Sequence, residues 1–314
     1  QLVAVGCGAL AANTTGGCNT AVGKDAMLAN TTGANNAAVG QAALDSNTEG
    51  NSNVAMGRNS LASNTTAGNN TGIGAFSLEQ NVTGTSNTAV GQLSLNRNTA
   101  SNNTAVGRQA LEANTTGTDN TAVGFGALDV NTTAINNTAV GRNAMGANTT
   151  GHRNTSVGKD SMAVNTTGCC NASLGWASLN ANTTGCNNIA VGALALSANT
   201  TASDNTAVGA VALTSNTTGH SNVAIGHCAL YTNTEGDTNT AVGHHALKLN
   251  TTAADNTGVG RNALCTTTTG CVNTALGSSA MQSNTTGDNN IGIGGSTLFN
   301  NTTADNNTAV GTLA

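Results

Sequence analysis

Small, apolar and polar residues recur along the chain with a period of seventeen residues. The clearest marker is the glycine of an Ala-Val-Gly type box, which recurs from Gly6 to Gly311 through eighteen spacings. Only one spacing, from Gly91 to Gly107, is sixteen residues long. A period this short is typical of one supersecondary unit stacked many times along an axis. We therefore expect residues 1–314 to form one continuous domain of about eighteen coils.

Each repeat is numbered here from the Asn of its Asn-Thr-Ala-Val-Gly box. Position 2 exchanges Thr with Val, Ile and Ala, and position 4 is always Val, Ile, Leu or Met. These two positions predict a buried face of a short strand, and the small residues at positions 3 and 5 share its other face. We expect such a strand in every coil, for example at residues 121–124. Because Gly, Asn and adjacent Thr oppose a helix, the pattern predicts an all-β solenoid, a β-roll or β-helix.

Asn occupies two positions of nearly every repeat. Position 1 is Asn from Asn19 onward, and position 12 is Asn in every repeat except one, where Thr267 replaces it. Asn tolerates the left-handed corners of a tight coil, and identical Asn side chains on successive coils can bond amide to amide. We predict a structural ladder along position 1, formed by Asn19, Asn36, Asn53, Asn70, Asn87, Asn103, Asn120 and Asn137.

The Asn of position 12 has a second interpretation, because Asn-Thr-Thr is also an acceptor sequence for N-glycosylation. An outward-pointing side chain at this position would be a sugar site. The candidates are Asn13, Asn30, Asn64, Asn114, Asn131 and Asn148.

Positions 3 and 5 never carry a large residue, which predicts the close approach of another backbone. We interpret this small-residue face as a surface for packing between chains, so the expected partners are copies of the chain itself, side by side and end to end. The alternative is a flattened coil whose own two sheets touch there. The residues concerned include Ala105, Gly107, Ala122, Gly124, Ala139 and Gly141.

The chain carries very little charge, with 7% charged and 2% aromatic residues and a net charge of −5. An average globular protein is about 25% charged, so this surface must consist mainly of Asn, Thr, Ser and Gly. The chain has no basic stripe for nucleic acid and no apolar run near the roughly 20 residues of a spanning helix. We therefore predict neither a nucleic-acid partner nor membrane insertion. Both ends continue the repeat without a visible cap, which favours a segment of a longer fibre.

Residues seventeen apart become neighbours in a solenoid, so candidate chemistry must be sought in columns. Cys169 and Cys186 occupy position 16 of successive coils. The expected coil spacing of about 4.8 Å fits the Cα separation of about 4.4–6.8 Å that a disulfide requires, so we predict a disulfide. Glu112 and Asp129 stack at position 10, and we interpret them as surface charge.

Two further columns contain residue types that can bind metals. His227 stacks on His244 at position 6, and Cys228 stacks on His245 at position 7. If the strand continues through these positions, the two columns point to opposite faces, so we predict no metal site. Calcium binding at the stacked pair Asp288 and Asp305 is a weaker alternative. The chain contains no Gly-x-Ser-x-Gly motif and no phosphate loop, so we expect neither catalytic residues nor cofactors.

The repeat Asn-Thr-Ala-Val-Gly-x-x-Ala-Leu-x-x-Asn-Thr-Thr-Gly-x-x resembles the repeats that precede self-cleaving chaperone domains in phage tail fibres and related surface proteins. Its Ala-Val-Gly box is also similar to the head repeats of trimeric autotransporter adhesins. The resemblance covers the whole chain. It implies a left-handed β-roll in a homotrimer or another laterally packed assembly on the surface of a virion or cell. A cell-surface or glycan receptor would be contacted by parts outside this chain.

These observations predict a non-enzymatic structural filament or fibre outside the cell, such as a rigid rod or an adhesin or tail-fibre shaft. Ice binding by stacked Thr is an alternative. The Thr residues of positions 13 and 14 face opposite ways, however, which leaves a single outward column there. A second alternative is a carbohydrate-binding surface module, although few aromatic residues are present to stack on sugars.

Overall fold

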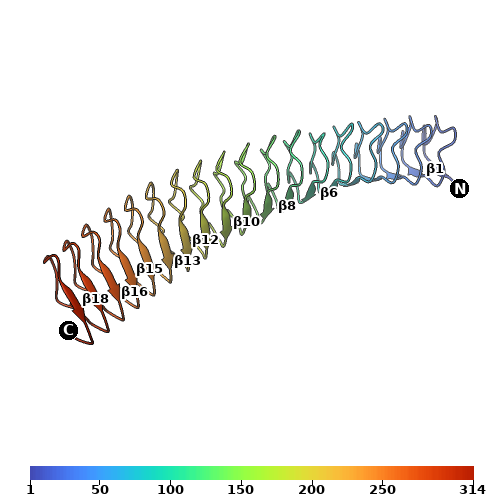
Figure 1. The fold of residues 1–314 in the computed structure, drawn as a ribbon. Helices are drawn as coiled ribbons and strands as arrows, with labels where there is room; N and C mark the ends of the chain where they lie inside the picture. Colours follow the sequence, from blue (N-terminus) through green and yellow to red (C-terminus); the bar gives the residue numbers. More distant parts are fainter. The chain divides into compact units, whose positions relative to one another are not determined.

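The computed structural model describes residues 1–314 and confirms an all-β solenoid of 17-residue coils without a helix. The chain divides into two compact units, Gln1–Asn154 and Thr155–Ala314, and both are stacks of the same coil (Figure 1). The first unit contains β1 (Val3–Val5), β2 (Thr20–Val22), β3 (Ala37–Val39), β4 (Val54–Met56), β5 (Thr71–Ile73), β6 (Thr88–Val90), β7 (Thr104–Val106), β8 (Thr121–Val123) and β9 (Thr138–Val140). The second contains β10 (Thr155–Val157), β11 (Ala172–Leu174), β12 (Ile189–Val191), β13 (Thr206–Val208), β14 (Val223–Ile225), β15 (Thr240–Val242), β16 (Thr257–Val259), β17 (Thr274–Leu276), β18 (Ile291–Ile293) and β19 (Thr308–Val310).

Each coil contributes one strand of three residues, at positions 2 to 4, and turns form the rest of the coil. Within each unit the strands pair in parallel with their sequence neighbours, and equal positions face each other, as Ala105 faces Ala122. The sixteen-residue coil keeps this register, because Thr88 of β6 pairs with Thr104 of β7. The deletion therefore falls in the turns and leaves the sheet undisturbed.

The strand presents its small residues to the inside of the coil, which is the reverse of the predicted orientation. Ala105, Ala122 and Ala139 have no exposed surface, whereas positions 2 and 4 are half-exposed or exposed in the same strands. The inside of the coil is too thin for larger side chains there. A Cβ placed on Gly72, also at position 3, would lie 2.6 Å from Oγ of Ser60 and 3.4 Å from Cγ of Leu61, both in the turns of the preceding coil.

The prediction that these alanines pack against another chain is therefore wrong. The flattened-coil alternative is closer to the structure, except that the opposite wall consists of turns and not of a second sheet. Alternating residues identify two faces of a strand, but they do not show which face is inside when both are uncharged.

The glycine of position 5 is required by the next coil of the same chain. Gly107 and Gly124 both have φ near 137°. A Cβ on Gly107 would lie 2.4 Å from the carbonyl oxygen of Gly124, and a Cβ on Gly124 would lie 2.4 Å from that of Gly141. The close backbone approach predicted for Gly107, Gly124 and Gly141 is thus between successive coils, and the assignment of these residues to a surface between chains is wrong.

The large apolar side chains of the interior form a column of Leu and Met at position 9. These residues adopt an unusual, left-handed backbone conformation. Leu111 and Leu128 are fully buried and have φ of 51° and 52°. Branched side chains at Cβ fit this left-handed region poorly. Position 9 is Leu or Met in every coil and never Val or Ile, although Val211 and Val272 adopt the same conformation at positions 7 and 17.

The inner and outer faces of the strand can be distinguished by paired substitutions in β8. Ala122→Leu should overpack the interior and destabilise the fold by about 1–3 kcal/mol. Thr121→Ile places a larger residue on the outer face, where Ile189 and Ile291 already occupy the equivalent position, and should leave stability nearly unchanged. Thermal unfolding followed by circular dichroism measures both. Equal effects of the two changes would contradict the observed orientation.

Candidate functional site

The outer face of the strands is a regular surface that the repeat creates. Position 2, mostly Thr, and position 4, always aliphatic or Met, both point outward and form two parallel columns along each unit. Neither column contains a charged residue. Exposed aliphatic side chains recur along it: Met56 is 43% exposed, Leu174 is 51% exposed and Ile225 is 40% exposed. We call these two columns the strand face.

Sequence reasoning missed this surface because it placed positions 2 and 4 inside the coil. Exchange among Thr, Val and Ile indicated β-branched residues correctly, but such residues suit an outward strand face as well as a core. The signal that could have identified the interior was the absence of any large residue at position 3.

The Asn-Thr-Thr segment carries a separate column of Thr, and only one of its two Thr residues is exposed. At position 13 the hydroxyl is used within the coil stack, since Oγ1 of Thr115 donates to the carbonyl oxygen of Thr132, 3.0 Å away. Thr116, at position 14, is exposed. The Asn-Thr-Thr segment therefore offers one outward Thr column, at position 14, which is separate from the strand face at positions 2 and 4.

The predicted Asn ladder at position 1 is confirmed. Oδ1 of Asn103 accepts the backbone N–H of Asn120 at 3.0 Å, and Nδ2 of Asn120 donates to the carbonyl oxygen of Ala134 at 2.9 Å. The same pattern includes all the predicted residues, Asn19, Asn36, Asn53, Asn70, Asn87, Asn103, Asn120 and Asn137, which are at most 2% exposed. Each side chain thus replaces a backbone partner that the coil lacks at its corner.

A second ladder follows position 12, and it excludes sugars from the predicted acceptor residues in the folded chain. Nδ2 of Asn131 donates to Oδ1 of Asn114 at 2.8 Å, and Nδ2 of Asn148 donates to Oδ1 of Asn131 at 3.1 Å. The glycosylation interpretation is wrong for Asn30, Asn64, Asn114, Asn131 and Asn148, which have no exposed surface. Asn13 is half-buried, and its Nδ2 donates to the carbonyl oxygen of Gly16.

The position 12 ladder breaks where the sequence departs from the repeat. Oδ1 of Asn250 has no hydrogen-bond partner because the next coil carries Thr267, which lacks an amide donor. Oδ1 of Asn81 is also unpaired, and the next coil is the sixteen-residue one, where Nδ2 of Asn98 donates to Ala100 instead. These breaks show that each rung depends on the residue seventeen positions further along.

Cys169 and Cys186 lie together as predicted but are free thiols in the structure. Their Sγ atoms are 2.9 Å apart, and Sγ of Cys186 also accepts the backbone N–H of Cys169. The hydrogen bond with Cys186, followed by burial, raises the pKa of Cys169 to about 12. The two Sγ atoms lie in contact, and the disulfide between them stays a prediction.

Position 16 has a structural role that its variability concealed. The backbone N–H of this position donates to a polar position 16 side chain of the next coil. The N–H of Thr85, for example, donates to Oγ of Ser101 at 3.0 Å. Asp288 and Asp305 accept in this way from Cys271 and Asp288, both at 2.7 Å. Because these carboxylates serve the backbone, the arrangement does not favour the calcium interpretation. Sequence reasoning could have noticed that Asp, Asn, Ser, Thr, Cys and His are concentrated at this position.

The carboxylates of Glu112 and Asp129, stacked at position 10, interact through their charges. Burial raises the pKa of Asp129, and the charge of Glu112 raises it further. The folded state therefore binds this proton more tightly than the unfolded state. The resulting stabilisation is complete below the ordinary Asp pKa and is lost as the pH rises through the raised value.

The histidine columns converge, contrary to prediction. The strand ends at position 4, so positions 6 and 7 lie on a turn and do not alternate between opposite faces. The ring centroids of His244 and His245 are 3.7 Å apart, and that of His227 is 5.5 Å from His244. The assumption behind the prediction of no metal site is therefore wrong.

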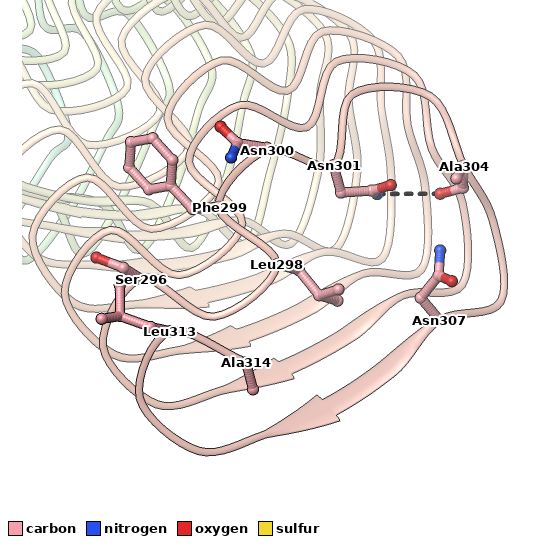
Figure 2. A pocket seen from close by; sticks show the side chains of 9 residues that line it. All are labelled: Ser296, Leu298, Phe299, Asn300, Asn301, Ala304, Asn307, Leu313 and Ala314. Atoms are coloured by element: carbon pink, nitrogen blue, oxygen red, sulfur yellow. Dashed lines mark hydrogen bonds between the residues drawn. The ribbon is translucent and has the colours of Figure 1, made fainter.

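A cavity of about 640 Å³ lies at the C-terminal end of the second unit (Figure 2). Its wall includes Leu298, Asn301 and Asn307, which occupy positions 9, 12 and 1. In other coils these positions are buried by the following coil, so the cavity is the uncovered side of a coil and is not a pocket built by special residues.

No protein-family model matches the chain, and no curated protein is significantly similar to it. The structure contains no helix long and apolar enough to cross a membrane.

From the ladder of position 12 we predict that two matched substitutions change the stability of the fold in opposite directions. Thr267→Asn should give Oδ1 of Asn250 its missing donor and stabilise the fold, and Asn131→Thr should create the same gap in an intact ladder and destabilise it. Each change should be about 1–3 kcal/mol, the range for a buried unsatisfied polar group. Denaturant unfolding of both variants measures the effect, and changes of the same sign would contradict the ladder.

Proposed function

We propose that this chain is a structural protein that forms a filament or fibre outside the cell and has no catalytic activity. The observation that supports this best is the strand face, two uncharged columns of half-exposed Thr and aliphatic side chains that continue along each unit. Soluble monomers rarely expose contiguous apolar patches larger than a few hundred Å².

The occupant that we propose for the strand face is a second copy of the same chain. A flat, uncharged surface whose residues repeat at every coil is complementary to itself. A partner of opposite charge would find no charge to recognise on it, because positions 2 and 4 carry none. Lateral packing of this kind agrees with the trimeric or bundled assembly implied by the resemblance to tail-fibre and adhesin repeats. The same resemblance supports a location on a virion or cell surface.

The lateral contact can be tested with three charges on neighbouring coils. Val106→Lys, Val123→Lys and Val140→Lys together place lysines on the strand face and should convert an oligomer into a monomer in sedimentation velocity. The matched control is Thr116→Lys, Thr133→Lys and Thr150→Lys, at exposed position 14, where Glu49 and Glu235 show that charge is tolerated. The control should assemble as the unmodified chain does.

Circular dichroism must show the same β-content in all three proteins. A monomeric unmodified chain at every concentration, or a strand-face variant that assembles normally, would contradict the proposal.

Ice binding is a second candidate, and the strand face is the observation that favours it. The outward Thr column at position 2 lies beside an outward aliphatic column at position 4 on regularly spaced parallel strands. Such a surface presents hydroxyl and methyl groups in a flat array without charge. It is wider than the single Thr column of position 14.

Thermal hysteresis of the monomeric fraction distinguishes the two candidates. A structural fibre should show no freezing-point gap. An ice-binding protein should show a gap that the three strand-face lysines abolish and the three position 14 lysines preserve, and that result would replace the fibre proposal.

A further inference from the structure

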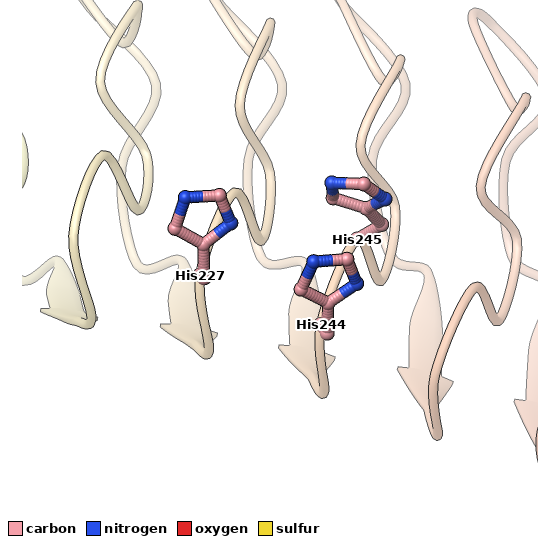
Figure 3. Close-up of side chains that lie close together, drawn as sticks. All are labelled: His227, His244 and His245. Atoms are coloured by element: carbon pink, nitrogen blue, oxygen red, sulfur yellow. The ribbon is translucent and has the colours of Figure 1, made fainter.

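Three histidines meet on the turns that follow β14 and β15 (Figure 3). His227 and His244 both occupy position 6, and their rings stack with centroids 5.5 Å apart and planes 11° from parallel. His245 lies next to His244, with centroids 3.7 Å apart and planes tilted by 35°. One ligand nitrogen from each ring lies within 4.8 Å of the others.

The fold creates this cluster through two features of the coil. Stacking in register brings His227 beside His244, seventeen residues apart. The left-handed conformation of position 7, with φ of 60° at His245, turns the chain so that this side chain lies next to its neighbour in sequence. The backbone N–H of His245 also donates to the carbonyl oxygen of His227 at 3.2 Å, which holds the two coils together at this point.

A cysteine lies beside one of the three histidines. Cys228, the position 7 residue of the preceding coil, is buried, and its Sγ lies 3.7 Å from Nε2 of His227. Three imidazoles and a thiolate are ligands that tetrahedral zinc sites use.

The rings need only small movements to enclose an ion. Zn–N bonds of about 2.0–2.1 Å put the nitrogens of a tetrahedral site about 3.4 Å apart. His227 and His244 are exposed and His245 is half-buried, and their ligand nitrogens already lie within 4.8 Å of one another.

We propose that His227, His244, His245 and Cys228 form a binding site for a divalent transition-metal ion, with zinc as the best-fitting occupant. The ion bridges two successive coils and clamps them together. On binding, the Cys228 thiol loses its proton to solvent and no other bond changes. Borderline ions such as Ni²⁺ and Cu²⁺ also suit imidazole ligands and would compete for the site.

The charges around the cluster set the conditions for binding. Burial lowers the pKa of His245, and His244, Lys248, His227 and Arg261 lower it further. Protons and the metal ion compete for the same imidazole nitrogens, so zinc affinity should fall as the pH drops. Since Lys248 and Arg261 are cations, the site depends on coordinate bonds and not on a general negative potential.

The histidines can be removed without disturbing the coil. Alanine already occupies position 6 at Ala193 and Ala210, and position 7 at Ala42 and Ala177. The triple variant His227→Ala, His244→Ala and His245→Ala therefore resembles other native coils. The remaining two histidines of the chain supply a matched control, His152→Ala with His220→Ala.

The experiment is equilibrium dialysis of the full chain against zinc under reducing conditions, with bound metal measured by mass spectrometry. The unmodified chain and the control variant should each hold one zinc ion more than the triple variant, and the difference separates this site from zinc held by other cysteines. Zinc should also raise the unfolding temperature of the first two proteins above that of the triple variant. Equal zinc in all three proteins, or loss of zinc in the control variant, would overturn the proposal.

Two further measurements test the ligands directly. Zinc should protect His227, His244 and His245 of the unmodified chain from diethyl pyrocarbonate while His152 and His220 stay reactive, and equal reactivity of all five would overturn the site. With Co²⁺ as the probe, Cys228→Ser should remove sulfur-to-cobalt charge-transfer absorption that the unmodified chain shows. An unchanged spectrum would exclude Cys228 as a ligand.

Discussion

Hydrogen bonding between successive coils is the constraint on which this structure depends. Only three residues of each coil belong to a strand, so a sheet ladder alone leaves most backbone groups of the coil without partners. The turns meet this need by bonding to the turns above and below, and one carbonyl oxygen often serves several donors. The oxygen of Thr48, for instance, accepts the N–H groups of Thr31, Thr32 and Gly33 at 3.0–3.1 Å. Buried Asn side chains supply the remaining partners, because unpaired polar groups inside a protein are costly.

This constraint explains why the interior is so unlike an ordinary hydrophobic core. Leu or Met at position 9 and mostly Ala at positions 3 and 8 supply the apolar contacts, and two hydrogen-bonded Asn columns run beside them. A substitution in one coil consequently affects the next, as the unpaired oxygen of Asn250 beside Thr267 shows. The repeat is preserved within the chain because a rung of a ladder requires the same residue on both sides.

The same stacking produces the surfaces from which function is proposed. A residue that points outward in one coil becomes part of a column, so the strand face extends wherever the repeat extends. Columns at the variable positions 6 and 7 do not contribute to the ladders through their side chains and are free to carry chemistry. His227, His244 and His245 are a local example, in which two neighbouring coils supply ligands that no single coil could bring together. A structural filament and a metal clamp between coils are thus compatible uses of one architecture.

The sequence by itself determined the period, the all-β solenoid, the position of the strand and the Asn ladder, because each follows from which residues recur and at what spacing. It also located the neighbours Cys169 and Cys186, since stacking in register makes residues seventeen apart adjacent. The tertiary structure alone decided which face of the strand is inside. Alternation of residue types along the strand identifies two faces but not which of them is inside. The turns opposite the strand set the thickness of the coil, and this thickness admits only small residues on the inner face.

The tertiary structure also decided the direction of the turns. Leu128 at φ of 52° adopts a left-handed conformation that its side chain does not favour, and His245 adopts the same conformation at φ of 60°. They are held there by hydrogen bonds to other coils, such as the bond from the N–H of Leu128 to the carbonyl oxygen of Ala144, at 3.1 Å. The burial of Asn131 and the convergence of the histidines follow from these turns. Local sequence preferences could not reveal them, because bonds between coils outweigh the intrinsic preference of a single residue.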